Sequence, residues 1–158
     1  MKKVITYGTF DLLHVGHVHL LRRARELGDH LTVAVSTDRF NEGKGKKTIL
    51  PFAERVEIVR SLRYVDEVIP EISWEQKADD VRRLQIDVFA IGADWTGKFD
   101  FLTPLCQVVY LPRTPDISSS QLKAELDRLQ SVQSLLERIH GSELKDLIGV
   151  LDKIVHLK

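Results

Sequence analysis

Two histidines three residues apart, His14 and His17, are the first residues in the chain whose type and spacing suggest chemistry. They stand where a loop leads into a helical pattern, and residues three apart on a helix share one face. The N-terminus of a helix offers unpaired backbone N–H groups and the positive end of the helix dipole, so it binds anions such as phosphate. Gly16, between the two rings, permits close approach of a ligand. The pair therefore predicts hydrogen-bond donors for oxygens whose negative charge grows during a reaction.

Two other interpretations of this pair are open from the residues alone. The rings could bind a metal ion, although the Glu of a zincin motif is missing and a single cysteine excludes a multi-cysteine site. The rings could also do no more than satisfy local hydrogen bonds. The loop is neither a Walker A loop nor a dinucleotide-binding fingerprint, because it lacks the glycine and lysine spacing of both.

The elements that must position this loop alternate between strand and helix patterns. Runs that favour β-strand cover residues 4–7, 31–35, 67–69, 87–92 and 108–111, and helical patterns cover residues 17–28, 51–62 and 74–84. This alternation predicts an α/β fold, a Rossmann-like, doubly wound, mostly parallel five-stranded sheet with flanking helices. In such sheets ligands bind at the carboxyl ends of the strands, where the strand order reverses. We therefore expect three loops that follow strands to meet over one site: residues 8–17, 92–98 and 112–120.

The C-terminal part of the chain reads as helix from about Ser118 onward, with a break predicted at Gly141-Ser142. We interpret residues 1–129 as a catalytic domain and residues 130–158 as an extra helical C-terminal tail. The apolar stripes of the tail are too short to predict a coiled coil. It could pack on its own domain, form an oligomer interface or begin a longer linker.

Composition excludes several classes of function. The chain has 158 residues, with 23 basic and 23 acidic side chains, so no net charge attracts a nucleic acid. One cysteine, Cys106, cannot form an intramolecular disulfide, which suits a reducing cytoplasm. Neither a signal peptide nor a run of about 18 apolar residues that could span a membrane is present in the sequence.

The first loop reads Gly-Thr-Phe-Asp and then His-Val-Gly-His, which resembles the signature of the HxGH nucleotidyltransferase superfamily. A second signature, residues 113–120 (Arg-Thr-Pro-Asp-Ile-Ser-Ser-Ser), resembles the Arg-Thr-x-x-Ile-Ser-Thr-Thr of its cytidylyltransferases, in particular those that act on glycerol 3-phosphate in teichoic-acid synthesis. The resemblance covers residues 1–129 and includes the segments Trp-Glu-Gln-Lys at 74–77 and Gly-Ala-Asp-Trp at 92–95. Val15 departs from the family pattern, which often has Trp there.

The reaction that the resemblance implies is in-line attack by the phosphate of a polyol phosphate on the α-phosphorus of CTP, with loss of pyrophosphate. His14, His17, Lys44 and Arg113 are the predicted catalytic residues. The predicted CTP-binding residues are Thr9, Phe10, His14, His17, Gly92, Asp94, Arg113, Thr114, Ile117 and Ser118. Ser118 is also placed to cap the following helix and expose its N–H groups to an anion.

The acceptor is expected to bind through a second set of residues: Asp11, Asp38, Lys44, Lys46, Arg55, Arg63 and Lys77. Lys44 and Lys46 lie in a glycine-bearing basic loop that closes over phosphates in the family, and Lys47 is expected to face solvent. Arg55 and Arg63, eight apart on one helical pattern, would bind the phosphate of the acceptor together. Trp74 and Trp95 are expected in the core or in the wall of the pocket, without a part in the chemistry.

We expect Mg²⁺ to arrive on the triphosphate of CTP, with no dedicated metal site in the protein and Asp11 as the carboxylate closest to such a role. The resemblance also implies a homodimer. An adenylyltransferase of the same superfamily and a catalytically inactive scaffold that uses the C-terminal helices are the rival functions. The resemblance favours glycerol 3-phosphate as the acceptor and CDP-glycerol as the product, and ribitol and ethanolamine phosphates stay open as alternatives.

Overall fold

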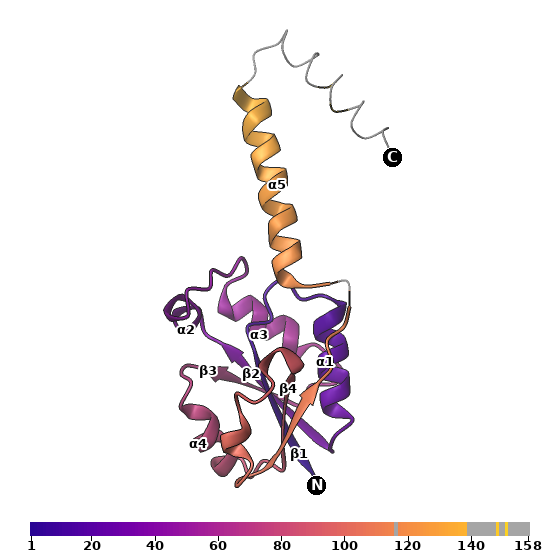
Figure 1. The fold of residues 1–158 in the computed structure, drawn as a ribbon, viewed down its shortest axis with the longest axis vertical. Coiled ribbons are helices and arrows are strands. Elements are labelled where there is room, and N and C mark those ends of the chain that lie inside the picture. The colour runs from indigo at the N-terminus through magenta and orange to yellow at the C-terminus, as the bar shows by residue number, and fades with distance from the viewer. Residues whose placement is uncertain (116, 139–147, 149–150, 152–158) are drawn as a thin grey trace. The chain divides into compact units, whose positions relative to one another are not determined.

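The computed structural model describes residues 1–115, 117–138, 148 and 151, and it divides the chain into two compact units, Met1–Ser119 and Ser120–Lys158 (Figure 1). The predicted domain boundary at residue 129 falls inside a continuous helix, α5, which runs through Ser119–Arg138. The break predicted at Gly141-Ser142 lies outside the described residues. Among the residues described, no helix is both long and apolar enough to cross a bilayer.

The first unit contains a five-stranded sheet in which every neighbouring pair of strands is parallel. The strand order is β3-β2-β1-β4-β5. The strands are β1 (Lys3–Gly8), β2 (His30–Ser36), β3 (Glu67–Glu71), β4 (Val88–Gly92) and β5 (Gln107–Leu111). The predicted fold is confirmed, and the strand order reverses between β1 and β4, which is the position where open α/β sheets bind ligands.

The strands alternate in the face that they present, as a period of two requires. On one face Val4, Val33 and Val88 pack against helices α1 (Val15–Arg25) and α3 (Phe52–Arg60). On the other face Ile5, Ala34 and Phe89 pack against α4 (Gln76–Arg83) and the two short 3₁₀ helices η1 (Ala93–Trp95) and η2 (Asp100–Leu102). Figure 1 shows α1 and α4 on opposite sides of the sheet. Helices thus cover both faces of the sheet, and a ligand is expected at the carboxyl ends of the strands.

One helix was not expected from the sequence. The segment read as the start of a basic loop forms α2 (Asp38–Gly43), whose N-cap Thr37 accepts a hydrogen bond from the backbone N–H of Phe40. The glycine-bearing loop therefore begins only at Lys44, where the helix ends. This short helix fixes the starting point of the loop and the direction in which Lys44 leaves it.

The described part of the second unit is α5 from Ser120 to Arg138 together with the single residues 148 and 151. Apolar side chains along it are exposed: Leu122, Leu126, Leu129, Val132 and Leu135. Arg128 forms an exposed ion pair with Glu125 one turn earlier. This part of the chain carries no residue of the predicted site.

Candidate active site

The local structure of the first loop depends on the histidines themselves. His14 is the N-cap of α1, and its Nδ1 accepts the backbone N–H of Gly16 at 3.1 Å. His17 Nδ1 accepts the backbone N–H of His14 at 3.4 Å, which completes a capping box. Because each Nδ1 accepts a hydrogen bond, the neutral ring carries its proton on Nε2. Both imidazoles are therefore arranged by the backbone to offer an Nε2–H donor to a ligand.

Close backbone approach explains two further features of this loop. A Cβ at Gly16 would lie 2.8 Å from His14 Cε1 and 3.2 Å from Ile117 Cγ2, so a side chain there would displace the His14 ring. Phe10 and Leu12 have φ angles of 52° and 48°, values that non-glycine residues rarely adopt. The buried ring of Phe10 packs edge-on against the ring of His17. The turn is thus strained where it delivers the two histidines.

The two imidazoles are neutral at physiological pH. Burial and, to a smaller extent, the neighbouring His14 ring lower the pKa of His17 to about 4, against the opposing effect of Asp11. Burial also lowers the pKa of His14. The rings stack with centroids 4.0 Å apart, so a proton on one disfavours a proton on the other. Neutral donors of this kind bind a phosphate without the cost of keeping two cations in contact.

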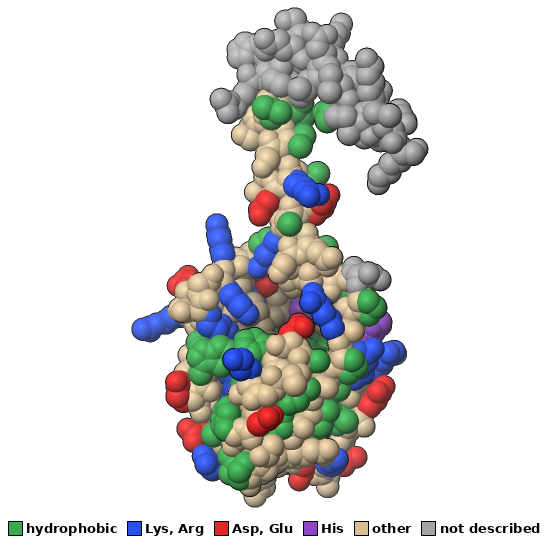
Figure 2. All heavy atoms as spheres, in the orientation of Figure 1, with side chains coloured by type: hydrophobic (Ala, Val, Ile, Leu, Met, Phe, Trp, Pro, Cys, Tyr) green, Lys and Arg blue, Asp and Glu red, His purple; other side chains and the backbone are tan. Residues whose placement is uncertain are grey.

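The predicted nucleotide residues come together in one pocket of about 190 Å³. Eight of the ten line it: His14, His17, Gly92, Asp94, Arg113, Thr114, Ile117 and Ser118. The other two lie beside it in the first loop, where the Thr9 hydroxyl donates to Asn41 Oδ1 and the Phe10 side chain is buried in the core. In Figure 2, Lys and Arg side chains surround a hollow in this unit and a histidine is visible inside it. The convergence of the first, middle and last loops is confirmed.

Side chains join the first and last of these loops. The Ser119 hydroxyl donates to the backbone carbonyl of Asp11 at 3.0 Å and lies 3.4 Å from His14 Nε2. Arg23 of α1 donates to the carbonyl of Pro112 at 2.8 Å, which ties the strand β5 exit to the same helix. Arg113 itself is largely exposed and lies 4.0 Å from the Asp94 carboxylate. The guanidinium therefore has a loose partner and stays available to a phosphate.

A second group of functional side chains lies on the β2–β3 side of the carboxyl edge. We call it the Glu71 cluster, and it comprises Ser36, Lys44, Glu71 and Lys77. The buried Glu71 carboxylate binds the Lys77 ammonium at 2.6 Å and accepts the Ser36 hydroxyl, while Lys44 Nζ lies 3.2 Å from Ser36 Oγ and 3.9 Å from Glu71 Oε2. Burial lowers the pKa of Lys44 to about 8, although Glu71 acts to raise it.

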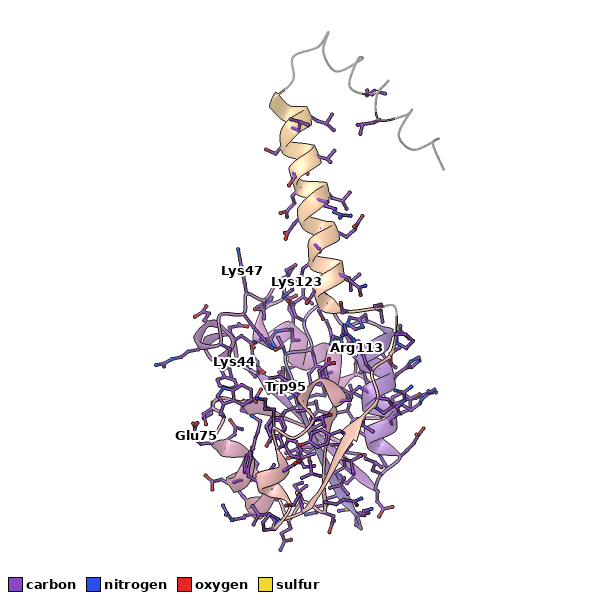
Figure 3. The ribbon with its side chains drawn as sticks, in the orientation of Figure 1. Lys44, Lys47, Glu75, Trp95, Arg113 and Lys123 are labelled. Atoms are coloured by element: carbon purple, nitrogen blue, oxygen red, sulfur yellow. The ribbon has the colours of Figure 1, made fainter. Side chains whose placement is uncertain are left out.

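The two sides meet at η1. Asp94 lines the histidine pocket, whereas the next residue, Trp95, packs against Trp74 with ring centroids 5.6 Å apart. Lys46 Nζ lies 5.8 Å from the centroid of the Trp95 ring. In Figure 3 the side chain of Trp95 lies between Lys44 and Arg113, and Lys47 points away from the unit. Trp95 packs against the hydrophobic core on this face of the sheet, and Trp74 is 40% exposed.

The prediction that Arg55 and Arg63 share one helix face is wrong. Helix α3 ends at Arg60, so Arg63 lies beyond it, exposed, and donates to the Tyr64 hydroxyl. Arg63 precedes β3, which places it at the amino edge of the sheet, opposite the histidines. Arg55 is fully buried. Its guanidinium donates to the backbone carbonyls of residues 9, 36 and 50 and to the Asp38 carboxylate, so four of its five N–H groups are used within the fold.

Three other predicted acceptor residues also have structural partners. Asp38 accepts from Arg55 at 2.6 Å and from the backbone N–H of Phe52. The Asp11 carboxylate is buried and accepts the backbone N–H groups of residues 49 and 50. Lys77 is 1% exposed and its ammonium is paired with Glu71. Arg55 and Lys77 therefore have partners within the fold, whereas Lys44 and Lys46 are the predicted acceptor lysines that lie beside the Trp74 and Trp95 rings.

The described residues contain no group of three or more His, Cys, Asp or Glu side chains that could hold a metal ion. Asp11, the carboxylate expected to lie closest to such a role, uses both oxygens on backbone amides. The donor set of the site, imidazole N–H, ammonium and guanidinium, suits the oxygens of a phosphate and does not coordinate a cation.

Sequence reasoning missed Ser36 and Glu71, which organise the lysines. Ser36 is the last residue of β2 and Glu71 the last residue of β3. The sequence pattern predicts a strand that ends at Ile69 and therefore places Glu71 in the loop that follows. A polar residue at the carboxyl end of a buried parallel strand is the signal that could have identified both residues as part of the site.

Comparison with known proteins agrees with this geometry. Residues 5–125 match the cytidylyltransferase-like family. The chain is 60% identical over 126 residues to the glycerol-3-phosphate cytidylyltransferase of Bacillus subtilis, covering 80% of this chain and 98% of that protein, and 57% identical over 126 residues to the enzyme of that name from Staphylococcus aureus, covering 80% and 96%. A solved structure, a lipopolysaccharide core biosynthesis protein from Thermoplasma volcanium, is 27% identical with a TM-score of 0.64 and covers 72% of this chain and 98% of its own.

Proposed function

This chain belongs to the cytidylyltransferase-like family, and on that premise we propose that it transfers CMP from CTP to glycerol 3-phosphate, forming CDP-glycerol and pyrophosphate. The observation that carries the proposal is the single pocket lined by both histidines of the first loop and by Arg113 of the last. Two relatives that share more than half of their residues with this chain are named for this reaction. An adenylyltransferase and an inactive scaffold are less well supported, because neither accounts for both facts.

In the proposed reaction an oxygen of the acceptor's phosphate attacks the α-phosphorus of CTP. The new P–O bond forms as the bond from the α-phosphorus to the bridging oxygen of the β-phosphate breaks, and pyrophosphate leaves with that electron pair. The attacking oxygen is already ionised, so the reaction needs no general base and no covalent enzyme intermediate. Catalysis then consists of aligning two anions and stabilising the added negative charge.

The side chains of the pocket suit the nucleotide part of this reaction. The Nε2–H groups of His14 and His17 would donate to phosphate oxygens of CTP, and the backbone amides that hold each Nδ1 keep those donors in place. Arg113 would bind the leaving pyrophosphate with its fork of N–H donors. Gly92, the last residue of β4, and Asp94 in η1 also line the pocket, and the base or the ribose would bind beside them.

The acceptor would bind on the other side of Trp95. Lys44 and Lys46 carry the positive charge that faces this space, and Lys44 is held by Ser36 and Glu71. An acceptor phosphate between Lys44 and the histidines would lie beside the α-phosphate of CTP. Two polyanions would then be neutralised by cations from two different loops, which brings them close enough to react.

We propose that Mg²⁺ enters bound to the triphosphate of CTP, where it neutralises part of the charge that the protein cations leave. The described residues contain no cluster of three or more His, Cys, Asp or Glu side chains that could hold it, and no step of the reaction is assigned to it. We also propose that the enzyme acts in the cytoplasm as a homodimer and supplies activated glycerol phosphate for a teichoic-acid-type polymer. Light scattering of the full chain would test the dimer.

The direct test is pyrophosphate release with purified protein, CTP and Mg²⁺ across a panel of phosphorylated alcohols, with the product identified by mass spectrometry. We expect turnover with glycerol 3-phosphate and a product of the mass of CDP-glycerol. A parallel panel of nucleotides should show CTP far above ATP. Turnover with ATP alone would favour the adenylyltransferase, and absence of turnover with every pair would favour the scaffold.

A further inference from the structure

The ammonium of Lys77 lies inside a cage of aromatic rings. We use the term aromatic cage for Tyr7, Phe40, Trp74 and Phe99. Lys77 Nζ lies 4.3 Å from the centroid of the Trp74 ring, 4.7 Å from Tyr7, 5.7 Å from Phe99 and 5.9 Å from Phe40. All four distances are within the range of a cation–π interaction.

A carboxylate completes this enclosure. Glu71 Oε1 binds the Lys77 ammonium at 2.6 Å, and both side chains are almost completely buried. Cages of aromatic rings are the arrangement with which proteins bind organic ammonium ions such as choline, and here a carboxylate adds an opposite charge. In this chain the cation in the cage is supplied by the protein itself, and it cannot leave.

The cage is close to where the acceptor would bind. Lys44 Nζ, a predicted ligand of the acceptor phosphate, lies 3.9 Å from the centroid of Phe40 and 5.5 Å from that of Trp74, so it borders the same rings. Trp74 is 40% exposed and forms the outer wall of the cage. An alcohol whose phosphate bound Lys44 would therefore place its far end against Trp74.

The charges in this region also disfavour a cationic acceptor. Lys44, Lys46 and Lys77 carry three positive charges near two buried carboxylates, Glu71 and Asp80. The nearby Asp80 accepts hydrogen bonds from the Tyr7 hydroxyl and from Gln76 and Arg83, which leaves it little capacity for a ligand. Figure 3 shows Glu75 on the outside of this region, and its side chain is exposed.

We propose that Lys77 determines acceptor specificity: its ammonium occupies the aromatic cage and thereby excludes alcohol phosphates that carry an ammonium group, leaving neutral polyol phosphates as substrates. This inference rests on the proposed cytidylyltransferase reaction and deepens it. Lys77 acts here by excluding a ligand and does not touch the reacting atoms. It follows that removing Lys77 converts the cage and Glu71 into a binding site for an organic cation.

The test is a competition assay with the full chain, CTP and an equimolar mixture of glycerol 3-phosphate and phosphoethanolamine, with both products quantified by mass spectrometry. The ratio of CDP-ethanolamine to CDP-glycerol does not depend on how much of a variant is folded. We expect Lys77→Ala to raise this ratio at least about tenfold, the factor that a desolvated cation–π contact supplies. Phosphocholine in place of phosphoethanolamine should give a shift in the same direction.

Three variants serve as controls. Lys77→Arg keeps a cation in the cage and should keep the wild-type ratio. Lys77→Ala combined with Glu71→Gln removes the carboxylate and should lose most of the gain. Lys98→Ala removes an exposed lysine outside the cage and should change nothing. If circular dichroism shows that Lys77→Ala does not fold, Lys77→Gln, which keeps a hydrogen-bond donor toward Glu71, takes its place in the same assay.

Two results would overturn the inference: an unchanged ratio in the folded Lys77 variant, or an equal gain in the double variant. Failure of the proposed function is separable, because it would appear as a wild-type protein that makes no CDP-glycerol at all. In that case calorimetric titration of phosphoethanolamine into wild type and Lys77→Ala decides the inference by itself. Tighter binding to the variant supports it, and equal binding contradicts it.

Discussion

The two halves of the candidate site solve the problem of binding anions in different ways. On the α1 side, neutral imidazoles are held by backbone amides, and the ion pair nearby, Arg113 with Asp94, is loose at 4.0 Å and more than half exposed. On the β2–β3 side, Lys77 and Glu71 are paired at 2.6 Å with exposures of 1% and 4%. The first half keeps its donors available for a ligand. In the second half most of the charged side chains pair with one another.

This difference predicts which mutations should lower the reaction rate and which should lower the stability of the fold. A donor that is positioned by the backbone and faces a pocket contributes to the reaction and little to folding. A buried charge whose partner is removed is left without compensation in a medium of low dielectric constant, so its loss affects folding first. Both kinds of effect can be compared as free energies, of unfolding in one case and of the transition state in the other.

The largest expected effect is on stability, from Glu71→Ala. The substitution leaves the Lys77 ammonium buried without its carboxylate, and breaking a buried pair from one side costs about 3–5 kcal/mol of unfolding free energy. Asp94→Ala, in the exposed pair, should change stability by less than about 0.5 kcal/mol. Urea denaturation of both variants measures the difference. Equal changes would contradict the contrast between the two halves.

The next effect is on turnover, from the histidines. His14→Asn keeps a side-chain oxygen that can cap α1 but has no donor at the position of Nε2, so the rate should fall about 100- to 1000-fold while the melting temperature stays near that of wild type. This fall corresponds to about 2.7–4 kcal/mol of transition-state stabilisation. Steady-state pyrophosphate release gives the rate, and calorimetry gives the stability. A variant with normal turnover would return His14 to a purely structural role.

A third effect links the His17 ring to acid stability. The folded protein leaves His17 neutral down to about pH 4, whereas the unfolded chain protonates it near 6.5. Between these values the unfolded state binds the additional proton, so the unfolding free energy falls as the pH drops from 6.5 to 4. The loss is at most about 3 kcal/mol from this group.

His17→Gln is the matched control for that dependence. Gln at the third helical position is a usual partner in a capping box, so the helix start is kept while the titrating ring is removed. Urea denaturation of both proteins at several pH values between 4 and 7 isolates the contribution of the ring as a difference. Parallel curves for the two proteins would show that the folded state does not suppress protonation of His17.

Much of this arrangement could be predicted from the sequence because it depends on local patterns. Buried runs of β-favouring residues identified the five strands, and the parallel sheet then required its loops to meet at the carboxyl edge. The signature residues His14, His17 and Arg113 accordingly lie around one pocket. The start of α1 at Val15, two residues before the helical pattern suggested, reflects the unusual use of His14 as its cap.

The acceptor side could not be predicted in the same way, because side-chain partners there come from distant segments. The eight-residue spacing of Arg55 and Arg63 suggested a shared face, yet the helix ends between them and Arg55 turns inward to three backbone carbonyls and Asp38. No pattern within one segment indicates that Lys77 pairs with Glu71. Burial of this kind is a property of the packed fold, and so is the lowered pKa of Lys44 that it causes.

The lowered pKa of Lys44 leads to the smallest predicted effect, which is a change in the reaction rate with pH. Burial places the pKa of Lys44 at about 8, so its ammonium is lost at a pH where an exposed lysine is still charged. If the ammonium binds the acceptor phosphate, kcat/KM for glycerol 3-phosphate should fall about tenfold per pH unit above 8. The fall should be carried by the KM of the acceptor more than by the KM of CTP, because Lys44 lies on the acceptor side.

Lys44→Arg distinguishes this cause from a general loss of activity in alkali. A guanidinium stays charged throughout the range, so the alkaline limb should move upward by more than one pH unit even though the rate at neutral pH is lower. Lys47→Arg, an exposed neighbour in the same loop, should leave the limb near pH 8. An alkaline limb that is identical in all three proteins would assign the titration to another group and would separate the buried charge of Lys44 from binding of the acceptor.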